Sequence, residues 1–241
     1  KINVDDENYT IDAGDGNNRV VAGNGDNSIS AGSGSDSITV GNGNNEILAG
    51  DGSNRIKTGD GNNSIQLGKG NDQVTVGRGS NVITTTSGNN RIIGTDGNNQ
   101  VTTGQGKDDI RLGHGDNTVA AGDGSNKVLA GNGSNTIETG SGADRITLGD
   151  GDNQVQAGGG NNQIIAGEGI NEITAGDGGD RITVGNNANI IQAGNGQNSI
   201  KAGTGNNHIS TGKDNDKILV GDGDNTINAG DGANRIKAGD G

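Results

Sequence analysis

The chain contains no cysteine, proline, methionine, tryptophan or phenylalanine, and only one tyrosine in 241 residues. Without cysteine it can form neither disulfides nor thiolate metal sites. A globular core of this length normally uses Leu, Phe and Met in quantity, and this composition cannot supply one. No stretch approaches the ~20 apolar residues that cross a bilayer as a helix. We therefore predict neither an ordinary globular domain nor a membrane span.

Positive charge is also scarce, because 17 Lys and Arg face 30 Asp and Glu, for a formal net charge of −13. An acidic chain without an evident basic patch has little to displace the counterions of a phosphate backbone, so no nucleic-acid partner is predicted. Low hydrophobicity at this charge usually indicates disorder. Regularly spaced Ile and Val instead favour stacked repeats that bury a thin core.

What the chain has is a nine-residue repeat. Residues 13–237 read as twenty-five consecutive nonapeptides without insertion or deletion, of which residues 49–57, AGDGSNRIK, are an example. Positions one to nine are small or aliphatic, Gly, polar, Gly, polar, Asn or Asp, variable, Ile or Val, and variable. A fixed period of this kind is typical of a solenoid.

Each nonapeptide is expected to form one short strand and one tight turn. Side chains alternate along a strand, which places positions six, eight and one inside and positions seven and nine outside. Glycine at positions two and four is expected to supply the positive φ that a strand-reversing turn needs. Four positions depart from this pattern: Thr86 and Thr95 at position two, and Asn187 and Asp214 at position four.

A second period of 36 residues underlies the first. Position six is Asn in nineteen repeats and Asp in six, namely Asp36, Asp72, Asp108, Asp144, Asp180 and Asp216. Position one of the following repeat is then always large, namely Val40, Val76, Leu112, Leu148, Val184 and Val220. Basic residues at position seven follow the same beat less strictly, at Arg19, Arg55, Arg91 and Lys127.

The 36 residues could form two turns of two nonapeptides or one square turn of four. A four-sided coil without aromatic residues would leave an underpacked interior, against the close packing of protein cores. Two facing sheets ~10 Å apart are filled by opposed Ile and Val. We therefore predict an all-β parallel solenoid with two nonapeptides, 18 residues, per turn.

The domain organisation follows the repeat. Residues 1–12 keep the nine-residue frame but replace the Gly-rich turn, which indicates a degenerate N-terminal repeat or cap. Residues 13–241 are expected to form a single solenoid domain. The sequence ends in mid-repeat, and we interpret it as a segment of a longer protein.

This pattern resembles the RTX (repeats-in-toxin) nonapeptide, Gly-Gly-x-Gly-x-Asp-x-U-x with U large and aliphatic, in an Asn-rich variant. The resemblance implies a right-handed parallel β-roll, secretion, and Ca²⁺ held in the turns by the Asp and by backbone carbonyls. The residues matching the metal-ligand position are Asp36, Asp72, Asp108, Asp144, Asp180 and Asp216. The first Gly of the motif is replaced almost throughout, and the ligand Asp is Asn in nineteen repeats.

The exchange of Asp for Asn has an electrostatic reason. Carboxylates stacked ~4.8 Å apart repel by roughly 3–4 kcal/mol per neighbour at an effective dielectric of 20. Stacked Asn side chains avoid that repulsion and can form an amide ladder or bond the turn backbone. We predict that Asn ladders replace most of the calcium, leaving fewer Ca²⁺ ions than repeats. The alternative is a conventional Ca²⁺-dependent module rescued by carboxylates at positions three and five, namely Asp15, Asp26, Asp51, Asp60, Asp116, Asp123 and Asp152.

No set of nucleophile, base and orienting group can be assembled, and His114 and His208 are expected to be exposed polar residues. We therefore predict a protein without enzymatic activity: a rigid spacer or fibril segment of a secreted or cell-surface protein. An ice-binding face is a second hypothesis, based on an outward Thr39, Thr75, Thr147 and Thr183 column that Arg111 and Leu219 interrupt. Self-association, end-to-end into a filament or lateral, is a third, and glycan binding by the basic residues at position seven is a further hypothesis.

Overall fold

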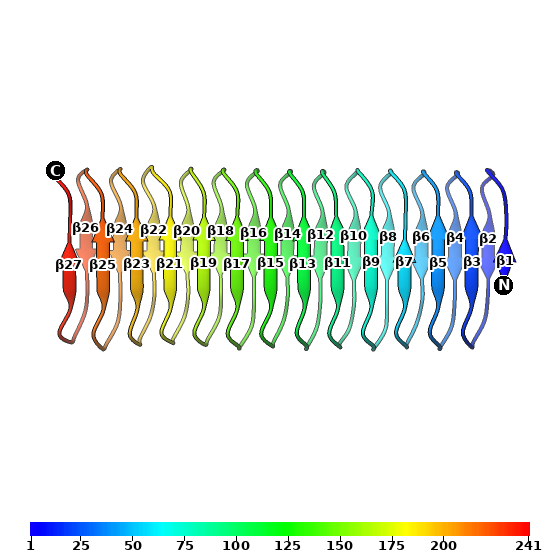
Figure 1. Ribbon diagram of the computed structural model, residues 1–241, viewed down its shortest axis with the longest axis horizontal. Helices are drawn as coiled ribbons and strands as arrows, with labels where there is room; N and C mark the ends of the chain where they lie inside the picture. The colour runs from blue at the N-terminus through cyan, green and yellow to red at the C-terminus, as the bar shows by residue number, and fades with distance from the viewer. The chain divides into compact units, whose positions relative to one another are not determined.

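The computed structural model describes residues 1–241, and all of its regular secondary structure is β-strand. Contacts divide the chain into two compact units, residues 1–121 and 122–241. Each unit is a solenoid of parallel strands, in which odd-numbered strands form one sheet and even-numbered strands form the other. In Figure 1 the odd-numbered strands lie in front of the even-numbered ones. The all-β parallel solenoid predicted from the repeat is confirmed.

In the first unit the odd sheet comprises β1 (Ile2–Asn3), β3 (Arg19–Ala22), β5 (Ser37–Val40), β7 (Arg55–Lys57), β9 (Gln73–Val76), β11 (Arg91–Gly94) and β13 (Asp109–Leu112). The even sheet comprises β2 (Thr10–Asp12), β4 (Ser28–Ser30), β6 (Glu46–Leu48), β8 (Ser64–Gln66), β10 (Val82–Thr84), β12 (Gln100–Thr102) and β14 (Thr118–Ala120).

In the second unit the odd sheet comprises β15 (Lys127–Ala130), β17 (Arg145–Leu148), β19 (Gln163–Ala166), β21 (Arg181–Val184), β23 (Ser199–Ala202), β25 (Lys217–Val220) and β27 (Arg235–Lys237). The even sheet comprises β16 (Thr136–Glu138), β18 (Gln154–Gln156), β20 (Glu172–Thr174), β22 (Ile190–Gln192), β24 (His208–Ser210) and β26 (Thr226–Asn228).

The strand register settles how many repeats make a turn. Val74 of β9 pairs with Ile92 of β11, which lies 18 residues further along the chain, and Ile164 of β19 pairs with Ile182 of β21. Two nonapeptides therefore form one turn in both units, as predicted. The 36-residue period spans two turns, so Asp and Asn alternate at position six along the edge that leads into the odd-numbered strands.

The core of each unit lies between its two sheets. The Ile and Val of position eight are almost fully buried, for example Ile38 and Ile146 at 0% exposure. The position-one residues beside them, such as Val40 and Leu148, and the Asn or Asp of position six are buried as well. Positions seven and nine are mostly exposed. The inward and outward sets predicted from strand alternation are therefore confirmed.

Glycine is needed at positions two and four of the turn for different structural reasons. Position four has positive φ almost throughout, as at Gly52 with φ 125°. At position two many glycines, including Gly41, have no positive φ, so the expectation of positive φ at both positions is wrong for these turns. A Cβ on Gly41 would instead lie 2.8 Å from the carbonyl carbon of Gly23 in the preceding turn. Close stacking of backbones, rather than φ, requires glycine there.

The first twelve residues follow the same path with shorter strands. Ile2 pairs with Val20, and Ile11 pairs with Ile29, so the degenerate repeat keeps the 18-residue register. The hydroxyl of Tyr9 donates a hydrogen bond to the carboxylate of Asp5. A capping role for residues 1–12, and a single domain over residues 13–241, stay predictions.

Candidate functional site in the turn ladders

A column of asparagine lines the turns that lead into the even-numbered strands, from β4 onward in the first unit and throughout the second. Asn27 illustrates its bonding: its Nδ2 donates to Oδ1 of Asn45, one turn further on, at 3.0 Å, and to the carbonyl of Gly25 at 3.0 Å. Its backbone NH also donates to the same Asn45 Oδ1, at 3.1 Å. In the second unit Asn171 and Asn189 repeat the pattern, with a side-chain bond of 2.9 Å. The predicted amide ladder is confirmed at this edge.

The turns that lead into the odd-numbered strands carry alternating Asn and Asp at position six, and their bonding differs. Oδ1 of Asp72 accepts the backbone NH of Asn54 at 2.8 Å. The Asn54 Nδ2 donates to the carbonyls of Gly50 and Gly52 in its own turn, at 3.2 and 3.3 Å. The bonds between successive position-six residues at this edge run from a backbone NH to a side-chain oxygen.

The second carboxylate oxygen of these Asp residues lies in the interior without a hydrogen-bond partner. Oδ2 of Asp36, Asp72, Asp144, Asp180 and Asp216 is buried and has no hydrogen-bond partner. Burial, only partly offset by the NH bond from Asn54, raises the pKa of Asp72 to about 6. The pKa of Asp180 is also raised to about 6, mainly by burial. Burial also raises the pKa of Asp108 and Asp144.

Carboxylates at positions three and five are exposed, and their oxygens accept hydrogen bonds from the next turn. Oδ1 of Asp15 accepts the backbone NH of Ser33, one turn on, at 2.7 Å, and also accepts the Ser33 hydroxyl at 2.9 Å. These bonds lower the pKa of the exposed Asp15, and Ser141 does the same for Asp123. Asp26, Asp51, Asp60 and Asp152 likewise accept a backbone NH from the next turn. These residues connect adjacent turns directly.

Calcium was the cofactor implied by the repeat, and the turns fit it in part. The orphaned Oδ2 at position six is a hard oxygen donor that a cation would satisfy. However, no group of three or more His, Cys, Asp or Glu side chains is close enough together to hold a metal ion. Calcium affinity rises with the number of charged ligands. A site of this kind therefore has one buried carboxylate and would otherwise depend on backbone carbonyls.

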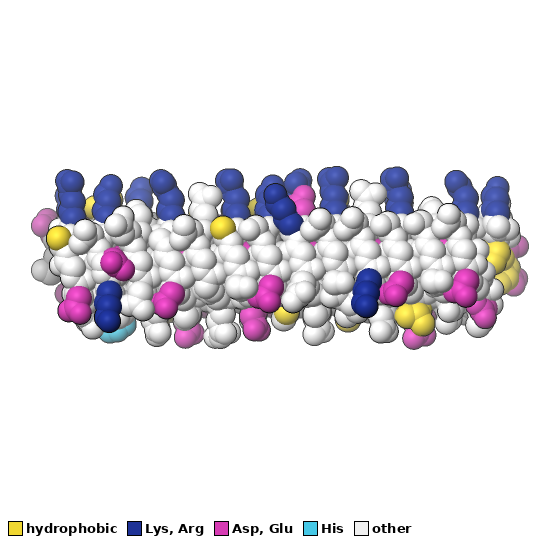
Figure 2. All heavy atoms as spheres, turned by 90° about the horizontal axis from the view of Figure 1, so that it is seen from below, with side chains coloured by type: hydrophobic (Ala, Val, Ile, Leu, Met, Phe, Trp, Pro, Cys, Tyr) yellow, Lys and Arg dark blue, Asp and Glu magenta, His cyan; other side chains and the backbone are white.

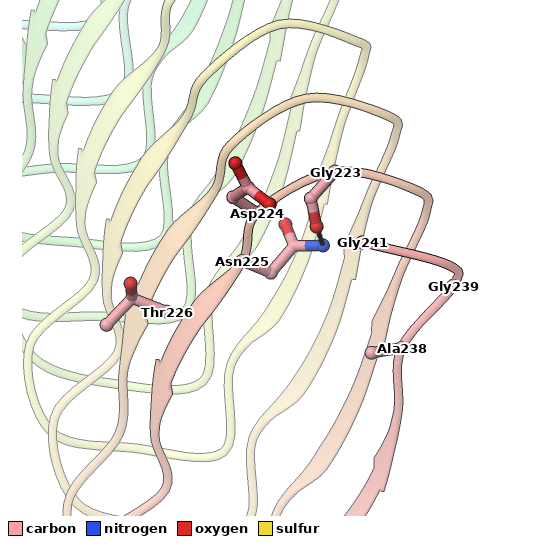
Figure 3. A pocket seen from close by; sticks show the side chains of 7 residues that line it. All are labelled: Gly223, Asp224, Asn225, Thr226, Ala238, Gly239 and Gly241. Atoms are coloured by element: carbon pink, nitrogen blue, oxygen red, sulfur yellow. Dashed lines mark hydrogen bonds between the residues drawn. The ribbon is translucent and has the colours of Figure 1, made fainter.

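One depression on the surface lies at the C-terminal end of the described chain. It measures about 420 Å³ and lies between Gly223–Thr226 and the last residues, Ala238–Gly241. Figure 3 shows the Asn225 amide directed at the carbonyl of Gly223, to which it donates at 2.8 Å. Asp224 is the only ionisable side chain in its lining.

Both His114 and His208 are exposed, as expected.

One feature of the surface was missed from the sequence. All strand-borne Lys and Arg, twelve of the chain's 17, lie in odd-numbered strands, and the even-numbered strands have none. The expectation that the chain has no basic patch is therefore wrong, although its net charge is −13. The 36-residue beat of Arg19, Arg55 and Arg91 was the available signal, because residues 36 apart always fall in the same sheet of an 18-residue coil.

Repeated parallel turns, glycine-rich bends and a laddered position six define a β-solenoid built of nonapeptides. The model of the RTX calcium-binding nonapeptide repeat family, four copies long, matches residues 12–47, 48–83, 84–119, 120–155, 156–191, 183–218 and 219–241. The chain belongs to this family. No curated protein and no solved structure matched the chain. No helix in the structure has the length and apolar character needed to cross a membrane.

Proposed function

We propose that the chain is a non-catalytic structural segment of a secreted or cell-surface protein, acting as a rigid spacer. The observation that carries this proposal is the amide ladder at position six, exemplified by the 2.9 Å bond from Asn45 Nδ2 to Asn63 Oδ1. The Asn amide donates to a neighbouring side chain and to turn carbonyls, where a conventional repeat of this family would place Ca²⁺. The turns are thereby joined without metal.

Calcium binding in this proposal is limited to the Asp-bearing turns. The candidate ligands are Asp36, Asp72, Asp108, Asp144, Asp180 and Asp216, which occur once in every four repeats. A bound cation would neutralise a buried carboxylate, so it would add stability without being required for folding. A fully Ca²⁺-dependent module is less well supported, because most carboxylates at positions three and five already bond the next turn.

The proposal is tested by thermal melts followed by circular dichroism, in EDTA and in millimolar Ca²⁺. A folded β-solenoid in EDTA, with a modest rise of Tm in Ca²⁺, is the expected result. Binding to the native state alone stabilises by RT ln(1 + [Ca²⁺]/Kd), about 2.7 kcal/mol at a hundredfold excess over Kd. An unfolded chain in EDTA that folds on addition of Ca²⁺ would establish the conventional module instead.

The ice-binding hypothesis gains no support from the register. Thr39 pairs with Lys57, and Lys57 pairs with Thr75, so a cationic side chain separates these two threonines. Ile165 likewise separates Thr147 from Thr183, so no two threonines of the column are neighbours. End-to-end self-assembly into a filament stays a prediction.

A further inference from the structure

The odd sheet of the second unit is a cationic surface on an acidic body. Residues 122–241 contain eight Lys and Arg and fifteen Asp and Glu, a net charge of −7. Seven of the eight basic residues lie on the odd-numbered strands, and none of the fifteen acidic residues does: Lys127, Arg145, Arg181, Lys201, Lys217, Arg235 and Lys237. In Figure 2 Lys and Arg side chains stand in a row along the upper edge of the view.

These cations are free to bind something outside the chain. All seven side chains are exposed, and none makes a side-chain hydrogen bond or an ion pair with the rest of the protein. Arg111, in the first unit, is the one strand-borne cation with an ion-pair partner, and it bonds Asp109 on the same strand at 2.9 Å. Lys and Arg at the edge of a sheet discourage unwanted pairing, but these residues lie on the face of the sheet.

The register arranges the cations on two columns. At position seven Arg181 pairs with Ser199, and Ser199 pairs with Lys217. At position nine Lys201 lies between Thr183 and Leu219. From β21 to β27 every strand carries a cation: Arg181 at position seven, Lys201 at position nine, Lys217 at position seven, and one at each position in β27. Successive strands are ~4.8 Å apart.

Between the columns the surface is hollowed. A depression of about 140 Å³ is walled by Arg181, Lys201 and Lys217, with Ser199 and Thr183 in its lining. A second depression of about 160 Å³ adjoins it and is lined by Lys217, Leu219, Arg235 and Lys237, together with Ile218. Lys217 belongs to both depressions. The two hollows form a short path that runs across the strands.

We propose that this path on the odd sheet of the second unit, the cationic path, binds a linear sulfated polysaccharide. A sulfate ester presents three terminal oxygens, which matches the three cations, Arg181, Lys201 and Lys217, around the first hollow. Charge-assisted hydrogen bonds from Arg and Lys are the strong ones, and Arg can bond an oxyanion through two N–H groups. The Ser199 hydroxyl and the apolar Leu219 offer the sugar ring both a polar and an apolar contact.

The surroundings favour a thin chain over a broad anionic surface. Turns on either side of the odd sheet carry acidic residues, Asp177 and Asp231 at one edge and Glu168, Asp222 and Asp224 at the other. A membrane plane would bring its negative charge against those edges, where screening is incomplete within about 8 Å at physiological salt. A single polysaccharide strand lies within the cationic path and avoids them.

Nucleic acid fits less well. Single strands bind through aromatic side chains on which bases stack, and the only aromatic residue of the chain is Tyr9, in the first unit. A face of seven strands, roughly 30 Å wide at ~4.8 Å each, does not enter a major groove about 12 Å wide.

The test is calorimetric titration of the full chain with dextran sulfate, using unsulfated dextran as the matched neutral polymer, over a series of salt concentrations. The triple variant Arg181→Gln, Lys201→Gln, Lys217→Gln removes the walls of the first hollow. Its matched control, Lys69→Gln, Lys107→Gln, Lys213→Gln, removes the same charge from exposed turns. Circular dichroism verifies that both variants keep the fold.

We expect dextran sulfate to bind and dextran not to bind. The path variant is expected to lose at least about tenfold in affinity and to show a shallower salt dependence, because fewer counterions are released on binding. The turn control is expected to change affinity by less than about twofold. Equal losses in both variants, or no binding by the parent chain, would overturn the proposal. Tighter binding to anionic vesicles or to an oligonucleotide of equal charge would also overturn it.

Discussion

Oδ1 of Asn63 accepts two hydrogen bonds from Asn45, one turn earlier: 2.9 Å from the side-chain amide and 3.2 Å from the backbone NH. The Asn63 amide passes the pattern on, donating to Asn81 at 2.8 Å. Each Asn is thus both acceptor and donor, whereas an ionised carboxylate can only accept. A carboxylate at this edge could still accept bonds from the preceding turn, but it could not donate to the next one, so the chain of side-chain bonds would end there.

Asn63→Asp is therefore expected to lower the free energy of unfolding by about 2–4 kcal/mol, since it buries a charge and removes two donated bonds. Urea unfolding followed by circular dichroism measures the effect. Asn62→Asp is the matched control, because Asn62 is exposed and uses only its Oδ1, to accept the Ser80 NH. Similar losses of unfolding free energy in the two variants would show that the ladder bonds of Asn63 contribute no more to stability than the exposed bond of Asn62.

Stability should fall as the pH rises from mildly acidic to neutral. The pKa values of Asp72 and Asp180 are raised from 3.8 to about 6, so the folded state holds their protons more tightly than the unfolded chain. Their contribution is fully present below about pH 3.8 and is lost as the pH rises through about 6. The loss is about 2–3 kcal/mol per carboxylate at 1.36 kcal/mol for each pKa unit.

Asp15 and Asp123 act in the opposite sense, because their pKa values are lowered. Their contribution is present above the ordinary Asp pKa and is lost on further acidification. In EDTA we therefore expect Tm to be highest at about pH 4–5 and lower at pH 7. A Tm that rises steadily from pH 5 to pH 7 would refute this account of the buried carboxylates.

Asp72→Asn should stabilise the chain at pH 7 in EDTA by about 2 kcal/mol, because it replaces an unpartnered buried charge with an amide. The new amide can bond turn carbonyls as Asn54 bonds those of Gly50 and Gly52. The variant should also bind one Ca²⁺ fewer if Asp72 is a ligand. Asp26→Asn, at an exposed turn position, is the matched control and is expected to be near neutral. Destabilisation by Asp72→Asn in EDTA would contradict the claim that the buried Oδ2 of Asp72, which has no partner, lowers the stability of the fold.

Gly52→Ala should be strongly destabilising, by about 3 kcal/mol or more, because it combines an unfavourable φ with a steric clash. The new Cβ would lie 1.9 Å from the carbonyl oxygen of Gly34 in the preceding turn, at φ 125°. Gly16→Ala separates the two effects, since Gly16 has φ 99° but nothing within 4 Å of a Cβ. The difference between the two losses of unfolding free energy measures the cost of the clash. Equal losses would assign the whole effect to φ.

The sequence predicts most of this fold because the repeat leaves few choices. The nine-residue period and the alternation of Ile56 with exposed neighbours were enough to predict the sheets, the core and the 18-residue turn. The Asn ladder followed from the cost of stacking carboxylates. These features depend on a repeated pattern, which one sequence displays twenty-five times.

Features that depend on individual neighbours were not predictable. Nothing in the sequence distinguishes the two oxygens of Asp72, and only the packed structure shows that one is bonded and the other buried without a partner. The need for glycine at Gly41 likewise arises from the backbone of the preceding turn. The cationic path required knowing which repeats share a sheet, and then that Arg181, Lys201 and Lys217 border one hollow.

Asp214 and Asn187 are the two residues other than glycine with positive φ, at 86° and 91°, and both occupy position four. Such conformations cost about 1–3 kcal/mol for a residue with a Cβ. Asp214 makes no side-chain hydrogen bond that would offset this cost. Asp214→Gly should therefore raise the free energy of unfolding by about 1 kcal/mol after the greater chain entropy of unfolded glycine is deducted.

Asp214→Asn provides the control for charge, since it removes the same negative charge and keeps the Cβ at φ 86°. Urea unfolding at pH 7 should give Asp214→Gly a clearly higher free energy of unfolding than the parent chain, and Asp214→Asn a value close to that of the parent. Equal stabilisation by both substitutions would mean that relief of charge repulsion, in a chain of net charge −13, matters more than backbone strain at this turn. If strain dominates, glycine is favoured at position four on energetic grounds alone, because the same relief applies at every turn with this geometry.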